Sequence, residues 1–319
     1  MASERRFRFG VINETVLDGP AWVAQVRRIE ALGYDTFLIR DHFVPDFFGD
    51  HLGPLAAMAT AAAVTDRLRV GTLVLSNDYR HPVLLAKELA TIDHLSGGRL
   101  EVGIGAGWLR TEYERAGLPY DRAGTRIARL EESLHVLRAI WADGPACFEG
   151  AHYQVHGIDG QPKLVQRPHP PILIGAGQPK MLQLAGREAD IVGILTTSVA
   201  TGTVLDDPTE RTAAAVERKL DYVREGAGDR YDELELSLIP TIIPTDDRER
   251  SAAELIASRG WQGIDVNDVL VMPSLLIGTE DEICDTLELR RERYGFSYYV
   301  VSDKEFEAFA PVVSRLAGR

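Results

Sequence analysis

Two adjacent residues that could carry out proton transfer, Asp41 and His42, follow the apolar run DTFLI after one intervening residue, Arg40. A short run of this kind is typical of a buried strand, and α/β enzymes carry their chemistry at the carboxyl ends of parallel strands. An imidazole at such a place can donate or accept a proton near neutral pH, and a neighbouring carboxylate can orient it. Asp and His also close many strands as ordinary turn residues, so a catalytic pair and a turn are both open at this point.

A second polar cluster, SNDYRHP at residues 76–82, follows the apolar run RLRVGTLVL. Asn77 and Asp78 carry the amide and carboxylate groups that can hold a polar heterocycle. Pro82 suits the first turn of a helix and keeps the residue before it extended, so part of this segment is turn chemistry. A ligand site at Asn77 and Asp78 and a polar loop both remain as interpretations.

Glycine is concentrated where a further apolar run ends, in LEVGIGAGWLRTEYERAG. Gly103, Gly105 and Gly107 alternate there, and glycine on one face of a strand lets a planar ligand approach the backbone. The pattern lacks the GxGxxG spacing, with an acidic residue about 20 positions later, of a dinucleotide-binding fold. We therefore reject a Rossmann fold.

The segment ILIGAGQPKMLQLAG ends another apolar run with Gly175, Ala176 and Gly177, and a helix is predicted to begin near Pro179. Free backbone N–H groups at a helix N-terminus can hold a phosphate. A plain tight turn between strand and helix is the alternative.

The motifs lie in a chain where apolar runs alternate with helical patterns from end to end. Strands are expected at 8–12, 35–39, 69–75, 100–107, 172–177, 189–195, 234–240 and 297–301. Helices are expected at 22–33, 54–64, 83–95, 125–141, from about 179, and at 210–225, 248–260 and 279–295, with a short extra helix within 266–274. Eight strands and eight helices predict a TIM (β/α)8 barrel, as a single domain over residues 1–319. The Gly- and Pro-rich stretch at about 145–171 predicts an insertion of small β structure.

Composition narrows the choice of partners. A net charge of -13 disfavours nucleic acid and anionic membranes and favours a small-molecule substrate. Cys147 and Cys284 show no disulfide or zinc spacing, and no histidine pattern indicates a metal site. No apolar segment has the pattern of a signal peptide or reaches membrane-spanning length, so we expect a soluble cytoplasmic protein.

Taken together, IRDHF, the stretch from VGTLVLSNDYRHP to YERAGLPYD, QRPHPPILIGAGQPKMLQLAG and APVVSRLAG resemble the luciferase-like monooxygenase superfamily. Within it, the chain is most similar to the branch that uses the deazaflavin coenzyme F420. The resemblance covers nearly the whole chain, and the order of its motifs is specific. It implies a TIM barrel with insertions and a flavin-like ring lying across the carboxyl face of the barrel.

The resemblance also implies roles for single residues. A non-proline cis peptide is expected at Leu73-Val74, against the centre of the ring. The residues expected to contact the coenzyme are Leu73, Val74, Ser76, Asn77, Asp78, Gly105, Ala106, Gly107 and Trp108 near the ring, and Gly175, Ala176, Gly177 and Gln178 at its phosphate.

For catalysis, the resemblance makes His42 the expected proton donor and Asp41 its orienting residue. An Asp-His pair after the second strand is more typical of deazaflavin users than of FMN monooxygenases. Several deazaflavin dehydrogenases have a glutamate where Trp108 stands, which argues against a sugar-phosphate or alcohol dehydrogenase of that kind. Glu112, about one helical turn farther on, is the alternative proton donor.

The function expected from these motifs is hydride transfer between C5 of F420 and a small organic substrate. The alternatives are an FMN-dependent monooxygenase on the same fold and a flavin-binding barrel without turnover. A homodimer is expected from the resemblance and from apolar helix surface such as the alanine-rich AAMATAAAV.

Overall fold

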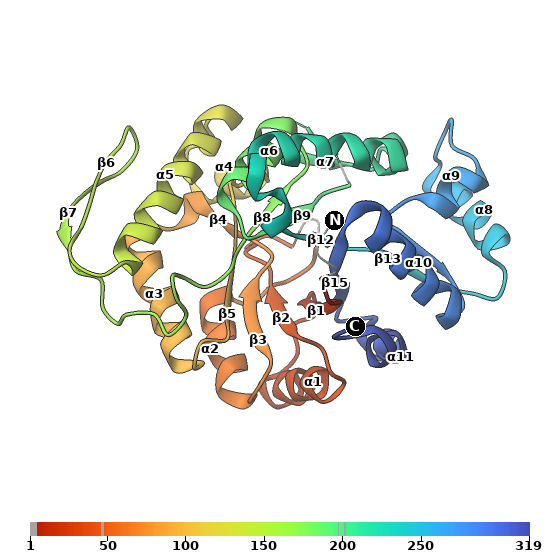
Figure 1. Cartoon of the computed structure of the whole chain (residues 1–319), viewed down its shortest axis with the longest axis horizontal. Helices are drawn as coiled ribbons and strands as arrows, with labels where there is room; N and C mark the ends of the chain where they lie inside the picture. The colour runs from red at the N-terminus through yellow and green to blue at the C-terminus, as the bar shows by residue number, and fades with distance from the viewer. Residues whose placement is uncertain (1–4, 46–47, 197, 201) are drawn as a thin grey trace.

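Eight parallel strands close into a barrel that is surrounded by helices (Figure 1). The computed structural model describes residues 5–45, 48–196, 198–200 and 202–319. The barrel strands are β1 (Arg8–Asn13), β2 (Thr36–Ile39), β3 (Arg69–Thr72) with its continuation β4 (Leu75–Ser76), β5 (Leu100–Gly105), β8 (Ile172–Ala176), β9 (Ile191–Ile194), β12 (Glu235–Leu238) and β15 (Phe296–Ser302). They pair in the order β3-β2-β1-β15-β12-β9-β8-β5, and the pairing of β3 with β5 closes the ring. The predicted TIM barrel is confirmed.

The strands bury both of their faces, which explains their continuous apolar sequences. Ile12, Leu38 and Tyr298 belong to a cluster inside the barrel. Their chain neighbours Val11 and Phe37 belong to the larger core between the barrel and the helices. This alternation follows from the pleat of a strand, which turns successive side chains to opposite faces.

One helix of the surrounding ring follows each barrel strand. The surrounding helices are α1 (Gly19–Ala31), α2 (Pro54–Val64), α3 (Pro82–Leu95), α5 (Ala123–Trp141), α6 (Pro179–Glu188), α7 (Ala213–Ala227), α10 (Glu280–Tyr294) and α11 (Phe306–Leu316). Pro54, Pro82 and Pro179 each occupy the first turn of their helix, where a missing N–H costs nothing. A capping box of Thr279 and Glu282 starts α10.

Two excursions project from opposite sides of the barrel (Figure 1). The first is the antiparallel hairpin of β6 (Ala146–Glu149) and β7 (Gln154–Ile158), within the stretch expected to hold small β structure. The second contains β13 (Thr241–Pro244), α8 (Arg248–Arg259), α9 (Val266–Val271) and β14 (Leu275–Gly278). Strands β13 and β14 pair in parallel apart from the barrel.

The second excursion corrects one expectation. The helix predicted at 248–260 forms as α8, but it packs with α9 and β14 over a separate small core that includes Trp261 and Met272. The barrel helix between β12 and β15 is α10, and α11 completes the ring after β15. Helical periodicity shows that a helix buries one face, but it does not show which sheet that face meets.

Shorter elements complete the chain. They are η1 (Asn77–Tyr79), α4 (Arg110–Ala116), β10 (Ser198–Ala200), β11 (Thr203–Leu205), η2 (Pro208–Arg211) and η3 (Gly228–Glu233). In the part of the chain that the structure describes, no helix combines the length and apolarity needed to cross a membrane. Helix α4 matters most for the site, because it lies directly after the glycine-rich end of β5.

Candidate active site

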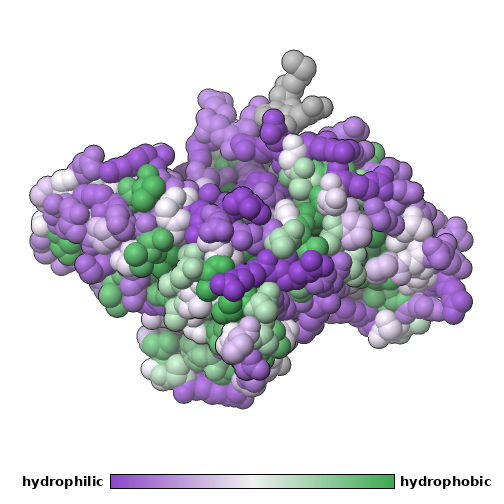
Figure 2. All heavy atoms as spheres, turned by 90° about the horizontal axis from the view of Figure 1, so that it is seen from below, coloured by the Kyte–Doolittle hydropathy of each residue, from purple (hydrophilic) through white to green (hydrophobic). Residues whose placement is uncertain are grey.

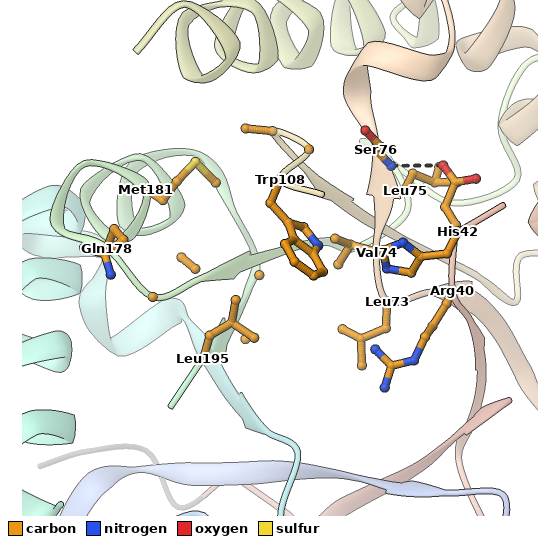
Figure 3. A pocket seen from close by; sticks show the side chains of 18 of the residues that line it. Arg40, His42, Leu73, Val74, Leu75, Ser76, Trp108, Gln178, Met181 and Leu195 are labelled. Carbon is orange, nitrogen blue, oxygen red and sulfur yellow. Dashed lines mark hydrogen bonds between the residues drawn. The ribbon is translucent and has the colours of Figure 1, made fainter. Parts of the chain in front are cut away.

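A cavity of about 290 Å³ opens at the carboxyl ends of the barrel strands (Figure 3). Residues at the ends of β2, β3, β4, β5, β8, β9 and β12 surround it. The lining consists of Arg40, Asp41, His42, Phe48, Leu73, Val74, Leu75, Ser76, Tyr79, Gly105, Ala106, Gly107, Trp108, Glu112, Ala123, Arg126, Ile127, Gly175, Ala176, Gly177, Gln178, Met181, Gly193, Ile194, Leu195, Ser237, Leu238 and Ile239. Most of this surface is apolar.

His42 is held at the edge of the cavity by a carboxylate from another part of the chain. Its Nδ1 lies 3.0 Å from Oε2 of Glu112, a residue of α4 that is only 1% exposed. The same carboxylate accepts hydrogen bonds from the Tyr79 hydroxyl at 2.7 Å and from the backbone N–H of Phe43 at 2.8 Å. The bond to Nδ1 leaves Nε2 as the ring nitrogen that can exchange a proton with a ligand.

The electrostatics of Glu112 favour its charged form. Burial alone would raise the pKa of this carboxyl, but the hydrogen bond and charge of His42 and the bonds from Tyr79 and Phe43 lower it below its ordinary value. Burial and the bond to Glu112 raise the Tyr79 pKa far above its ordinary value, so that hydroxyl stays a donor. Glu112 is therefore a fixed anion that orients His42.

Asp41 has a different role from the one expected. Its carboxylate accepts two hydrogen bonds from the Arg80 guanidinium, at 2.5 and 3.0 Å, and one from the backbone N–H of Ser76 at 3.0 Å. A bidentate pair of this kind is strong and directional. Asp41 therefore fixes the chain after β4, and the orienting contact to the His42 ring comes from Glu112.

Asn77 and Asp78 do not line the cavity, contrary to the expectation that they rim a bound ring. Asp78 accepts hydrogen bonds from the Tyr113 hydroxyl at 3.0 Å and from Arg129 of α5 at 2.9 Å. Asn77 is 1% exposed, and its amide donates to the Tyr153 hydroxyl at 3.4 Å. The one-turn helix η1 directs both side chains outward, toward α5 and the hairpin, where they support the wall.

Aromatic rings form the wall beside His42. The ring of Phe48 lies 5.2 Å from the His42 ring, and the ring of Trp108 lies 5.9 Å from it in an edge-to-face arrangement. Figure 3 shows Trp108 between His42 and Val74 on one side and Met181, Gln178 and Leu195 on the other. The guanidinium of Arg40 stacks 4.1 Å from the centre of the Phe48 ring. This end of the cavity can hold a flat or apolar ligand.

A stretch of the wall has no side chains where Gly175 of β8 pairs with Gly193 of β9. A Cβ on Gly175 would meet only Val74, at 3.7 Å, and the nearest atom to a Cβ on Gly193 would be the Gly175 Cα, at 3.6 Å, so both positions could carry a larger side chain without disturbing the fold. Gly103 is different, because its Cβ would collide with the Thr72 carbonyl at 1.8 Å. Gly103 thus serves strand packing, whereas Gly175 and Gly193 leave cavity space.

The structure brings the other predicted contact residues together. The cavity lining includes Leu73, Val74, Ser76, Gly105, Ala106, Gly107, Trp108, Gly175, Ala176, Gly177 and Gln178. The predicted cis peptide at Leu73-Val74 is confirmed. The backbone of 177–178 leads into α6, whose first turn has no side-chain cap.

Several lining residues were not predicted. Tyr79 belongs to the SNDYRHP segment, and Arg40 immediately precedes Asp41, so the motifs that predicted the site contain or adjoin both residues. Leu195 and Ile239 follow β9 and β12, and the rule that sites lie at strand ends would have found them had it been applied to every strand. No local pattern singled out Phe48.

Comparisons with known proteins bear on the family and the fold of this chain. Residues 17–270 match the model of the family described as luciferase-like monooxygenase. A protein from Nakamurella multipartita named F420-dependent glucose-6-phosphate dehydrogenase is 30% identical over 310 residues, which cover 93% of this chain and 83% of the relative. A Pseudomonas putida protein named FMNH(2)-dependent dimethylsulfone monooxygenase is 32% identical over 162 residues, 50% of this chain and 44% of that protein.

Among solved structures, the coenzyme F420-dependent tetrahydromethanopterin reductase from Methanopyrus kandleri superposes with a TM-score of 0.74. The match covers 98% of this chain and 100% of the reductase at 20% sequence identity. At that identity the likeness concerns the fold.

Proposed function

Because the chain belongs to the luciferase-like monooxygenase family, we propose that it is a coenzyme F420-dependent oxidoreductase that transfers a hydride between the deazaflavin C5 and a small organic substrate. One observation carries the proposal. A single cavity joins a wall without side chains, at Gly175 and Gly193, to a histidine whose ring is oriented by the buried carboxylate of Glu112.

The lining suits a planar tricyclic ring with an attached chain that carries a phosphate. Gly175 and Gly193 provide depth that even a small side chain would fill. Leu73 and Val74 offer an apolar surface for the ring. The backbone from Gly177 to Gln178, at the start of α6, presents N–H groups and the positive end of a helix dipole to an anion.

When bound, the deazaflavin supplies the hydride chemistry at C5. The protein's residues have three tasks. Trp108 and Phe48 exclude water from the region beside His42, and Glu112 holds the imidazole through Nδ1. His42 supplies or removes a proton at Nε2 as the substrate is reduced or oxidised, which is general acid-base catalysis.

The choice of F420 over FMN rests on two supports. The Asp41-His42 pair is the form more typical of deazaflavin users. The relative that aligns with 93% of this chain is named as F420-dependent, whereas the FMNH(2)-dependent relative aligns with 50%. An FMN-dependent monooxygenase is the second candidate, favoured by that shorter alignment.

Fluorescence quenching tests the proposal directly, with FMN and F420 titrated separately into the purified protein. We expect F420 to bind more tightly than FMN, and the F420 complex to catalyse substrate-dependent loss or gain of F420 absorbance without oxygen uptake. Tighter binding of FMN, with oxygen uptake on reduction, would establish the monooxygenase instead. Binding of F420 without turnover of any carbonyl, alcohol or imine substrate would indicate a coenzyme-binding barrel.

A further inference from the structure

The charged groups around His42 bear on the class of substrate. Among the described lining residues, the charged side chains near His42 are Arg40, Asp41 and Glu112. Asp41 is neutralised by Arg80. Glu112 is engaged by His42 itself, by Tyr79 and by a backbone N–H. Neither carboxylate is left to attract a cationic ligand.

The cation nearest this region is also paired. Arg40 donates from Nη2 to Oε1 of Glu14 at 2.5 Å, and its side chain is 12% exposed. The charge and hydrogen bond of Arg40 and a bond from the Ser302 hydroxyl hold the pKa of Glu14 below its ordinary value, although burial would raise it. Glu14 is thus ionised at neutral pH and cancels the charge of Arg40.

Arg126 is the remaining charged residue of the lining. Its donors are directed at two backbone carbonyls, those of Gly107 and Asp121, and its guanidinium lies over the Tyr120 ring at 4.4 Å. This arrangement holds the loop that carries Trp108. The other side of the cavity is formed by apolar residues such as Met181, Leu195 and Ile239.

We propose that the His42 end of the cavity takes an uncharged, largely apolar substrate with one carbonyl, hydroxyl or imine group, and that it rejects phosphorylated sugars. The reaction in this inference rests on the proposed function. The preference for an uncharged substrate is argued from the pairing of the charged side chains. A phosphate monoester at the His42 end would lose its hydration beside Arg40, whose charge Glu14 already compensates, and burying an unpaired charge is costly.

The reaction chemistry is consistent with a neutral substrate. In the reducing direction, a substrate C=O bond takes up a hydride from reduced deazaflavin at carbon and a proton from His42 at oxygen. The C=O π bond breaks while C–H and O–H bonds form, so two electrons and two hydrogens enter and an uncharged alcohol leaves. Neither substrate nor product requires a counter-ion in the apolar cavity.

Calorimetric titration with shape-matched ligands, in a buffer of inorganic phosphate that fills the anion seat at the start of α6, tests the inference at the His42 end without any turnover. The probes are cyclohex-2-en-1-one and cyclohex-1-ene-1-carboxylate, which share a ring and differ in charge, together with glucose and glucose 6-phosphate. We expect the enone to bind at least about tenfold more tightly than the carboxylate, and glucose 6-phosphate to bind no better than glucose. Equal or tighter binding of either anion, or no binding of the enone, would overturn the proposal.

The variant Glu14→Gln sharpens the test, because it releases Arg40 as an uncompensated cation. We expect the preference for the enone over the carboxylate to shrink severalfold. Glu114→Gln is the matched control, since it breaks an exposed pair with Arg110 outside the cavity lining and should leave the ratio unchanged. An unchanged ratio in folded Glu14→Gln would show that pairing at Arg40 does not set the preference, and would contradict this account. Wild-type ratios decide the question if Glu14→Gln does not fold.

The two proposals fail in different ways. Failure to bind F420 would contradict the proposed function but leave the ligand ratios, measured without coenzyme, as they are. F420 binding with efficient oxidation of glucose 6-phosphate would contradict only the substrate class.

Discussion

At the amino end of the barrel, Arg8 lies between two carboxylates, 2.7 Å from Glu101 and 2.6 Å from Glu235. At the carboxyl end, His42 lies 3.0 Å from Glu112. Both ends thus place a basic side chain against buried carboxylates. In the Arg8 cluster every charge has a partner, because Arg8 binds both carboxylates and the Tyr298 hydroxyl donates to Glu101 at 3.0 Å, whereas the Glu112 bond engages one nitrogen of the His42 ring and leaves the other beside the cavity.

The pKa directions at the two ends differ as well. At the amino end, burial raises the pKa of Glu235 and Arg8 compensates only in part. Burial would lower the Arg8 pKa, but Glu101, Tyr298 and Glu235 raise it above its ordinary value, so Arg8 stays charged. At the carboxyl end, hydrogen bonds lower the Glu112 pKa despite burial. Charges that saturate one another hold a fold together, while a charge that leaves one ring nitrogen uncommitted can take part in chemistry.

Arg8→Met is expected to have the largest effect, and on stability alone. It removes the 2.7 Å partner of the fully buried Glu101 carboxylate and leaves Arg69, at 3.8 Å, as a weaker one, which should cost about 3 kcal/mol in the free energy of unfolding, the lower end of the range for a broken buried pair. Urea denaturation measures this loss, and F420 affinity of the folded fraction should not change. Arg28→Met, which breaks an exposed pair with Glu307, is the control and should cost less than about 1 kcal/mol. A loss of stability in Arg8→Met as small as in the control would show that the Arg8 cluster does not stabilise the fold.

His42→Ala should reverse this pattern. Loss of the proton donor should slow turnover at least about a hundredfold, while F420 affinity and the urea midpoint change little. His156→Ala, on the exposed face of the hairpin, is the control and should behave like the wild type. Loss of coenzyme binding with normal reaction of the bound fraction would make His42 a coenzyme contact, and the proton donor would have to be another group.

Gly175→Val tests the wall without side chains. Because a Cβ at this position meets only Val74, at 3.7 Å, the variant should fold normally. The added side chain should enter the cavity and weaken F420 binding by at least about tenfold, equivalent to about 1.4 kcal/mol. Fluorescence quenching measures the affinity and thermal unfolding the stability. If Gly175→Val binds F420 as tightly as the wild type, the segment after β8 is a turn that does not contact the coenzyme.

The pH dependence of stability should have opposite signs at the two ends. Glu112 has a lowered pKa in the folded state, so its ionisation stabilises the fold above the ordinary glutamate pKa of about 4.3, and this contribution is lost as pH falls through the lower folded value. Glu235 has a raised pKa, so its ionisation destabilises the fold above that raised value, and the penalty disappears as pH falls below about 4.3.

Urea titrations of Glu112→Gln and Glu235→Gln between neutral and acidic pH measure this contrast. The stability advantage of the wild type over Glu112→Gln should shrink on acidification, and its advantage over Glu235→Gln should grow. The same sign for both variants would mean that the two ends do not differ in the way described.

Lys180→Ala should have the smallest effect. The oligoglutamate tail expected of F420 is anionic, and Lys180 is an exposed cation in the first turn of α6. Its removal should weaken binding by about two- to fivefold, in the range of an exposed ion pair, and more for longer tails. Equal affinity for coenzymes of different tail length in both proteins would exclude Lys180 from tail binding.

The sequence by itself determined the barrel and the strand-end composition of the site. Strands buried on both faces and helices with one apolar stripe leave clear periodic patterns, and the chain order of strand and helix implies the parallel ring. For that reason the sequence alone predicts that His42, Trp108 and the Gly175 turn lie at one end of the barrel. The sequence did not predict that residues 241–278 leave the barrel, because their helices and short strands carry the same local patterns as those of the barrel.

Only the tertiary structure decided which polar groups meet. Asp41 is the chain neighbour of His42, but adjacent side chains in an extended segment point apart, and the carboxylate that holds the ring comes from Glu112, 70 positions away. In the same way, Asp78 follows an apolar strand end yet is paired with Arg129 behind the wall. The local sequence pattern indicates which apolar side chains a segment buries. Its hydrogen-bond partners depend on the directions in which distant segments approach one another.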